Sequence, residues 1–195
     1  MKIIVGVTGA TGAIYAARTL RALLTNGHRV ELVVSKFGML TLKEELGFSG
    51  SFEAWLKEQY GGELSVHNHL DQTASIASGS GGVDGMVVVP CTMKTLACIA
   101  HGYSTNLIER SADVVLKEKK PLVLVPREAP YNLIHLKNMV SVAEAGAIVL
   151  PASPAFYQKP TTFDELGDFI AARALNFFGI RLDLFPPWQG LDRDE

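Results

Sequence analysis

The sequence lacks several features that would place it in a class at once. It has only two cysteines in 195 residues, and its formal net charge is −2. A balance so close to neutral gives no electrostatic reason to expect a nucleic acid or a membrane surface as partner. No apolar run is long enough to cross a bilayer, and no cationic leader precedes the first apolar run. We therefore expect no nucleic acid partner, no membrane span and no signal peptide.

The thiols and imidazoles do not form a metal-binding pattern. Cys91 and Cys98 lie on one expected helix, at a spacing that fits neither a zinc site nor a disulfide framework. Unpaired thiols are typical of a reducing compartment, so we expect a cytoplasmic protein. The histidines are scattered, and no cysteine or carboxylate completes a site around His67 and His69. We expect no metal, and no Ser–His–Asp arrangement is evident.

What the chain does have is a regular alternation of apolar runs and helical patterns. Strands that are apolar on both faces and separated by helices predict a parallel sheet covered on both sides. We predict one domain over residues 1–195, a Rossmann-like open parallel α/β sheet with helices on both faces. The expected strands are Ile3–Val7, Val30–Val34, Leu64–His67, Gly85–Val89, Leu122–Val125 and Ala147–Leu150. The expected helices are Gly12–Asn26, Phe37–Glu45, Phe52–Gln59, Lys94–His101, Asn106–Lys119, Leu133–Ala145 and Phe163–Phe178.

The first expected strand runs directly into a glycine-rich turn. Its glycines, Gly6, Gly9 and Gly12, are spaced G-x-x-G-x-x-G, which matches neither the G-x-G-x-x-G of dinucleotide-binding folds nor a P-loop. Such a turn aims free N–H groups and the positive end of a helix dipole at an anion, and Thr8 and Thr11 add hydroxyl groups. The alternative interpretation is that these glycines only allow the backbone to bend.

Polar residues follow the expected strands. In an open parallel sheet, ligands bind beyond the carboxyl ends of the strands, so these residues should meet at one rim. Hydroxyls, glycines and cations at a rim suit a phosphorylated ligand. The segments concerned are Ser35-Lys36, residues 77–82, residues 90–95, residues 126–130 and residues 151–157.

Two further groups of charges each allow two interpretations. Arg110 and Lys117 share one face of an expected amphipathic helix, so they could grip a second anion or form a solvated face paired with neighbouring carboxylates. Arg127 and Glu128 follow a buried strand between two prolines. Arg127 could clamp a phosphate while Glu128 exchanges a proton with a substrate, or the two could be a loop ion pair.

Several ordered blocks together resemble one family, the UbiX/Pad1 flavin prenyltransferases. The similarity runs from about residue 2 to about residue 188, nearly the whole chain. The blocks that carry it are residues 7–13, 34–36, 77–80, 90–96, 106–113, 116–118, 121–130, 134–139 and 154–157, with Arg173 downstream.

The resemblance implies a function. Members bind reduced FMN and attach a dimethylallyl group from dimethylallyl phosphate to its N5 and C6 atoms, without a metal. The prenylated FMN then serves a UbiD-type decarboxylase. Members assemble as dodecamers with active sites at subunit junctions, so we expect a homo-oligomer of that kind.

The resemblance also implies residue roles. The expected catalytic residues are Glu45, Lys117, Glu128 and Tyr157, with Glu128 as the proton relay to the leaving phosphate. The expected substrate contacts are Arg110, Lys117, Arg127, Tyr157 and Arg173. The expected FMN contacts are Gly9, Ala10, Thr11, Ser35, Thr92, Met93, Lys94, Thr95 and Arg127. Thr11 and Thr92 stand where many members have serine, and Gln72 stands where some have tryptophan.

Two other functions compete with this one. A related group of flavoproteins decarboxylates cysteine-containing substrates, but residues 151–157 do not carry its P-x-M-N-x-x-M-W motif. A non-catalytic FMN carrier would need Ser35 and Thr92, but it would not need the expected catalytic and phosphate-binding residues, which favours an enzyme.

Overall fold

Six parallel strands form one sheet in the order β3-β2-β1-β4-β5-β6. We describe it from a computed structural model, of which residues 1–184 are described here. The strands are β1 (Lys2–Val7), β2 (Arg29–Val34), β3 (Leu64–His67), β4 (Gly85–Cys91), β5 (Leu122–Pro126) and β6 (Ile148–Val149). This confirms the predicted open, Rossmann-like parallel sheet. The direction of strand order reverses between β1 and β4, the point at which such sheets bind ligands.

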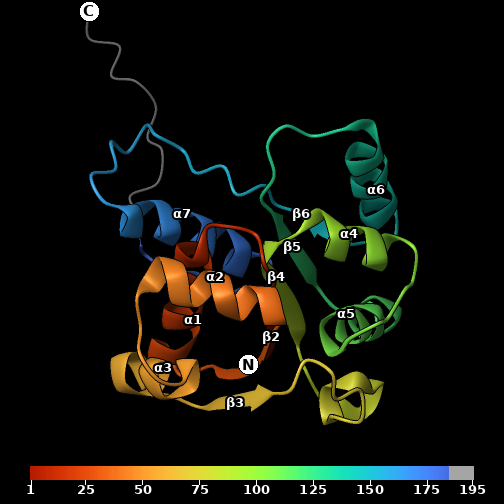
Figure 1. The fold of residues 1–195 in the computed structure, drawn as a ribbon, viewed down its shortest axis with the longest axis horizontal. Helices are drawn as coiled ribbons and strands as arrows, with labels where there is room; N and C mark the ends of the chain where they lie inside the picture. Colours follow the sequence, from red (N-terminus) through yellow and green to blue (C-terminus); the bar gives the residue numbers. More distant parts are fainter. Residues whose placement is uncertain (185–195) are drawn as a thin grey trace, which may run out of the picture.

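Helices cover both faces of the sheet (Figure 1). The helices α1 (Ala13–Thr25), α2 (Lys36–Leu46), α3 (Phe52–Tyr60) and α7 (Phe163–Asn176) lie on one side, and α4 (Met93–Ala100), α5 (Leu107–Lys117) and α6 (Leu133–Glu144) on the other. Two apolar cores result, one under each layer. No helix within residues 1–184 has both the length and the apolar character that crossing a membrane requires.

The central strand β1 supplies both cores because its side chains alternate between the two faces. Ile3, Val5 and Val7 enter the core under α1 and α7, whereas Ile4 enters the core under α5. Each of these side chains is at most 1% exposed. Burying a side chain of this size contributes about 1.5–3 kcal/mol, so β1 holds the two layers together.

Most helices begin at a side chain that caps their free N–H groups. Among residues 1–184, six α-helices have such a cap, from Ser35, Ser51, Thr92, Asn106, Asn132 and Thr162. Helix α1 is different, because it begins at Gly12, which has a φ of 97° and no side chain to offer. Its first N–H groups need a partner from elsewhere in the chain.

The structure departs from the sequence-based expectations in several places. The expected last strand shortens to Ile148–Val149, and the helix expected over Asn106–Lys119 runs only from Leu107 to Lys117 because Asn106 caps it and Lys119 takes a φ of 54°. Two 3-10 turns, Ser75–Ala77 and Gly79–Gly81, were not predicted. The predicted domain boundary at residue 195 lies outside the described residues.

The position expected for residues 77–82 was wrong. Lys2 Nζ donates a hydrogen bond of 2.9 Å to the Gly81 carbonyl, and Asp84 N donates to the Lys2 carbonyl at 2.8 Å. Lys2 is the first residue of β1, so this loop has already crossed to the amino edge of the sheet. The serines of this loop therefore do not join the rim at the carboxyl ends of the strands.

A buried carboxylate ties three neighbouring strands together. Glu31 in β2 is 2% exposed and contacts Lys2 Nζ at 3.3 Å, Arg29 Nε at 3.2 Å and His67 Nε2 at 2.6 Å. Burial alone would raise the pKa of the Glu31 carboxyl, but the hydrogen bonds from His67 and Lys2 outweigh it and lower that pKa. The ionised carboxylate therefore stabilises the fold.

We predict that Glu31→Gln lowers the free energy of unfolding by about 2 kcal/mol at neutral pH, measured by urea titration at fixed protein concentration. Because the folded-state pKa lies below the ordinary value of 4.5, this contribution is fully present above pH 4.5 and is lost as the pH falls through the lowered value. The gap between wild type and variant should therefore narrow in acid. Glu53→Gln, which breaks only an exposed pair with Lys57, is the matched control and should cost less than about 0.5 kcal/mol. A gap that stays constant with pH would contradict this account.

Candidate functional site

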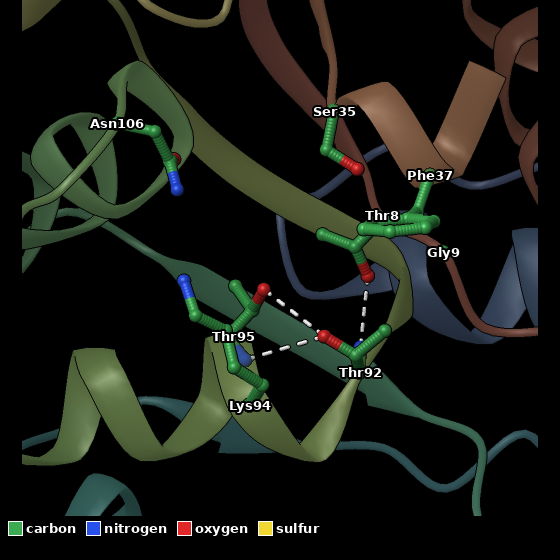
Figure 2. A pocket seen from close by; sticks show the side chains of 8 residues that line it. All are labelled: Thr8, Gly9, Ser35, Phe37, Thr92, Lys94, Thr95 and Asn106. Carbon is green, nitrogen blue, oxygen red and sulfur yellow. Dashed lines mark hydrogen bonds between the residues drawn. The ribbon is translucent and has the colours of Figure 1, made fainter.

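A cavity of about 520 Å³ opens beyond the carboxyl ends of the central strands, at the reversal in strand order. Figure 2 shows the side chains around it, which come from the segments that follow β1, β2 and β4 and from the start of α5. The residues that line it are Thr8, Gly9, Ser35, Phe37, Thr92, Lys94, Thr95 and Asn106.

Three helix N-termini meet at this cavity, because the residues that cap them are also lining residues. Ser35 Oγ accepts from Gly38 N at 3.0 Å at the start of α2, and Thr92 Oγ1 accepts from Thr95 N at 3.2 Å at the start of α4. Asn106 Oδ1 accepts from Glu109 N at 3.1 Å at the start of α5. The positive ends of three helix dipoles therefore favour an anionic ligand.

Thr8 holds two sides of this cavity together. Its hydroxyl donates to the Pro90 carbonyl at 2.7 Å and accepts from Thr92 N at 2.8 Å. The side chain is thus fully used between the ends of β1 and β4, and Thr8 is 3% exposed. Thr8 positions the start of α4 rather than offering a free hydroxyl to a ligand.

Close packing fixes the start of α2 against the glycine-rich turn. A Cβ atom on Gly9 would lie 2.5 Å from Phe37 Cβ, and one on Gly38 would lie 2.6 Å from the Val7 carbonyl oxygen. Any side chain at either position would push α2 away from β1. These two glycines therefore set the width of the cavity at the Ser35 side.

A second cavity, also of about 520 Å³, lies on the other side of the glycine-rich turn. Here Glu45 Oε2 accepts hydrogen bonds from Gly12 N at 2.9 Å and Ala13 N at 2.7 Å. The predicted anion at the start of α1 is thus present, but it is a carboxylate of the chain itself. This side chain supplies the cap that Gly12 cannot. The residues that line the cavity are Gly12, Ile14, Tyr15, Glu45, Leu46, Phe163 and Asp164.

Arg127 carries a buried donor that has no protein partner. Its backbone N–H donates to the Cys91 carbonyl at 3.3 Å, which places it beside the end of β4, and its Nε is buried without a hydrogen bond. Buried donors are nearly always paired, so this one fits a ligand that completes the site. Burial raises the pKa of the Tyr15 phenol, and the charge of Arg127 opposes that rise. The charge of Arg127 therefore acts on the Tyr15 phenol, whose side chain lines the second cavity.

Glu128 does not neutralise Arg127. Its Oε1 accepts from Ala129 N at 3.1 Å, and within residues 1–184 no ion pair joins it to Arg127. The interpretation of these residues as a loop ion pair is therefore not what the structure shows. Both side chains are half-buried, so both can reach a ligand.

Two of the other expected residues lie on the α7 side of the molecule. Tyr157 packs edge-on against Phe169 of α7, with ring centroids 6.5 Å apart, and is 46% exposed. Arg173 is exposed in the last turn of α7. Gln72, which stands where some family members have tryptophan, lies elsewhere and donates to the Ser104 carbonyl at 3.2 Å.

The cations of α5 lie away from the cavity. Arg110 donates to the Ala77 carbonyl at 3.1 Å and pairs with Asp113 at 2.8 Å, while Lys117 pairs with Glu118 at 2.7 Å. Both face the loop that carries the 3-10 turns, and neither lines the first cavity. Within one chain Arg110 and Lys117 therefore form a partly solvated face paired with neighbouring carboxylates, the second of the two interpretations given from the sequence.

The structure gathers part of the expected set in one place. Five of the expected FMN contacts line the first cavity, namely Gly9, Ser35, Thr92, Lys94 and Thr95. Ala10 and Met93 are buried and Thr11 is exposed, and none of them lines it. Phe37 and Asn106 line it but were not assigned a role from the sequence. The Asn-x-x-Glu pattern of a helix start could have identified Asn106, whereas nothing in the sequence marks Phe37.

Comparison with known proteins gives the family. The family model described as Flavoprotein matches residues 1–175. A protein of Bacillus subtilis named "Probable UbiX-like flavin prenyltransferase" is 45% identical over 195 residues, covering 100% of this chain and 93% of that protein. This chain belongs to the UbiX family of flavoproteins.

Two solved structures of UbiX-type proteins agree with the fold in detail. A dodecameric FMN-dependent UbiX-like decarboxylase from Escherichia coli O157:H7 superposes with a TM-score of 0.89 at 43% identity, covering 97% of this chain and 100% of that one. AnUbiX (PadA1), solved with FMN and dimethylallyl pyrophosphate, gives a TM-score of 0.88 at 41% identity, with 98% of each chain covered. The UbiX resemblance predicted from the sequence blocks is confirmed.

We predict that Thr8→Val destabilises the protein by about 2 kcal/mol, because it leaves Thr92 N without its buried partner and leaves the Pro90 carbonyl with only the residue 8 backbone N–H, at 3.2 Å. Valine keeps the shape of threonine, so the change isolates the hydroxyl. Thr11→Val, at an exposed position of the same turn, should change the free energy of unfolding by less than about 0.5 kcal/mol. Equal effects of the two variants in urea titrations would show that the Thr8 hydroxyl does not join the two strands.

Proposed function

We propose that this chain is a flavin prenyltransferase that joins a dimethylallyl group, donated as its phosphate or pyrophosphate, to N5 and C6 of reduced FMN. Its product would be prenylated FMN for a UbiD-type decarboxylase. The observation that carries the proposal is the meeting of three helix N-termini in one cavity, at the sheet reversal of a UbiX-family chain. Two relatives support it, one named as a prenyltransferase and the other solved with FMN and dimethylallyl pyrophosphate.

The residues of the first cavity fit FMN. The starts of α2 and α4 offer backbone N–H groups and the hydroxyls of Ser35 and Thr92 to a phosphate. Gly9 leaves space where a side chain would collide with Phe37. Arg127 follows β5 and does not line this cavity, but its unpartnered Nε would add a cationic donor beside the end of β4. Reduced FMN, when bound, supplies the nucleophilic N5 and C6 atoms.

The remaining residues act on the prenyl donor. Arg127, Arg110 and Lys117 are cations, and together with the Tyr157 hydroxyl and Arg173 they would hold the departing phosphate without a metal. Glu128 is half-buried next to Arg127, where it can pass a proton to that phosphate. Glu45 keeps the start of α1 in place while it faces the second cavity.

The position of the α5 cations implies an oligomer. Arg110 and Lys117 are paired outside the first cavity of their own chain, so a second copy would receive them. The Escherichia coli neighbour is dodecameric, and we propose the same assembly here. The free thiols Cys91 and Cys98 fit a reducing, cytoplasmic setting.

The activity is tested by mass spectrometry of the flavin. The protein is incubated without oxygen with FMN, dithionite and dimethylallyl phosphate, and in parallel with the pyrophosphate. We expect a gain of one five-carbon prenyl unit on FMN. Bound flavin that gains no mass with either donor would instead favour the non-catalytic carrier.

In the same assay, Glu128→Gln should slow prenylation at least about tenfold while FMN affinity stays unchanged, because a positioned acid–base group is lost and no FMN contact is removed. Glu144→Gln, which changes an exposed carboxylate at the end of α6 and outside the first cavity, is the control for FMN affinity. A Glu128→Gln chain with wild-type turnover would remove this residue from the mechanism.

Sites shared between copies predict complementation. Lys117→Ala and Glu128→Gln chains should each be slowed at least about tenfold. Mixed oligomers assembled from equal amounts of both should regain roughly a quarter of wild-type activity, because some sites then receive both native residues. Co-expression with two affinity tags isolates the mixed oligomers. If they show no recovery, each site draws both residues from one chain.

A further inference from the structure

We infer that Glu109, anchored by the segment before α5, is a positioning residue that fixes the Lys94 ammonium at the wall of the first cavity, and so strengthens FMN binding. The inference rests on the proposed FMN site. Glu109 itself does not line the cavity, and neither the sequence motifs nor the resemblance assigns it a role.

The first observation is the contrast in burial between the two partners. Lys94 Nζ lies 2.7 Å from Glu109 Oε1, yet the Lys94 side chain is 65% exposed and the Glu109 side chain is 0% exposed. The carboxylate thus stands behind the wall while the ammonium stands at its surface. In Figure 2 the Lys94 chain extends from α4 toward the Asn106 side of the cavity.

The second observation is that the other carboxylate oxygen holds the segment before α5. Glu109 Oε2 accepts from Thr105 N at 2.8 Å and from Thr105 Oγ1 at 2.6 Å. Glu109 N in turn donates to Asn106 Oδ1 at 3.1 Å. One buried carboxylate therefore joins the first turn of α4 to the start of α5, and each of these segments contributes a residue to the cavity wall.

The third observation concerns charge. A lysine ammonium beside three positive helix ends is unfavourable until an anion arrives. The Glu109 carboxylate offsets this repulsion and keeps the ammonium at the wall. A hydrogen bond to Glu109 raises the pKa of Lys94. Burial would raise the pKa of Glu109, but the hydrogen bonds from Lys94 and Thr105 outweigh it and lower that pKa. Both groups are therefore ionised at neutral pH.

Burying a carboxylate costs free energy unless both of its oxygens accept hydrogen bonds, and removing the carboxylate leaves the buried donors without an acceptor. An exposed lysine gains little from an ion pair at the surface. Both oxygens of the Glu109 carboxylate have partners, whereas the Lys94 side chain is mostly exposed. This contrast points to a role for Glu109 in placing the Lys94 ammonium for a ligand.

A double-mutant cycle tests this directly, with FMN affinity measured by quenching of flavin fluorescence. Lys94→Gln should weaken FMN binding about tenfold, as expected for a lost hydrogen bond to a charged group, and Glu109→Gln should weaken it by a similar factor. If Glu109 acts through Lys94, the double variant should bind no more weakly than Lys94→Gln alone. The visible absorption of bound FMN should shift in the same way in all three variants.

Controls separate positioning from a merely structural role. Glu53→Gln removes an exposed carboxylate from α3 and should leave FMN affinity unchanged. If Glu109→Gln does not fold, Thr105→Val serves instead, because it removes the hydroxyl that donates to Glu109 at 2.6 Å. We expect FMN binding to weaken roughly two- to fivefold when Lys94 is native, and not to change when Thr105→Val is added to Lys94→Gln.

The outcomes are distinct. Additive losses in the double variant, or unchanged or tighter FMN binding by Glu109→Gln, would overturn the positioning role while leaving the proposed function intact. A wild-type chain that binds no FMN would overturn both.

Discussion

The Thr8 hydroxyl bridge between the ends of β1 and β4 is the contact on which the site depends most. The sheet reverses its order between these strands, so their ends are not joined by a single connecting helix. The Thr8 hydroxyl bridges these ends at 2.7 Å and 2.8 Å, beside a backbone hydrogen bond of 3.2 Å from Thr8 N to the Pro90 carbonyl. The start of α4 is fixed as a result, and the starts of α2 and α5 face it across one cavity.

A second constraint is that the N-terminus of α1 is capped by an anion of the chain itself, whereas the N-termini of α2 and α4 are not. The start of α1 receives the Glu45 carboxylate, because Gly12 has no side chain with which to cap it. The starts of α2 and α4 have only small hydroxyl caps, so their remaining N–H groups stay available. The chain thus pairs the free N–H groups of α1 internally and leaves those of α2 and α4 for a ligand. The proposed role of Glu109 follows the same principle, because its buried carboxylate holds the Lys94 ammonium near the positive ends of these helices.

The sequence predicted the elements of the fold well because its signals are local. Apolar runs located the strands to within a few residues, and the helical patterns between them located the helices. Contacts between distant segments were beyond its reach. Nothing near Glu45 indicates that it meets Gly12, and nothing near Lys94 indicates that Glu109 is its partner. Residues 77–82 were misplaced because a long connection can change edges of the sheet without a sign in its composition.

The expected site was likewise recovered in part. Residues that follow β1, β2 and β4 meet because parallel strands end at the same edge. Arg110 and Lys117 do not line the cavity of their own chain, since Arg110 is held by the Ala77 carbonyl and Asp113 and Lys117 pairs with Glu118. Under the proposed function their role requires a second copy, which no pattern in a single sequence specifies.

The central claim is that FMN binds where the starts of α2, α4 and α5 converge, and hydrogen–deuterium exchange tests it most directly. Addition of FMN should slow exchange in the first turns that follow Ser35 and Thr92, and in the segment around Asn106. The Gly12 and Ala13 amides already donate to Glu45 and should change little. Protection confined to Gly12 and Ala13, with none after Ser35 or Thr92, would contradict the account.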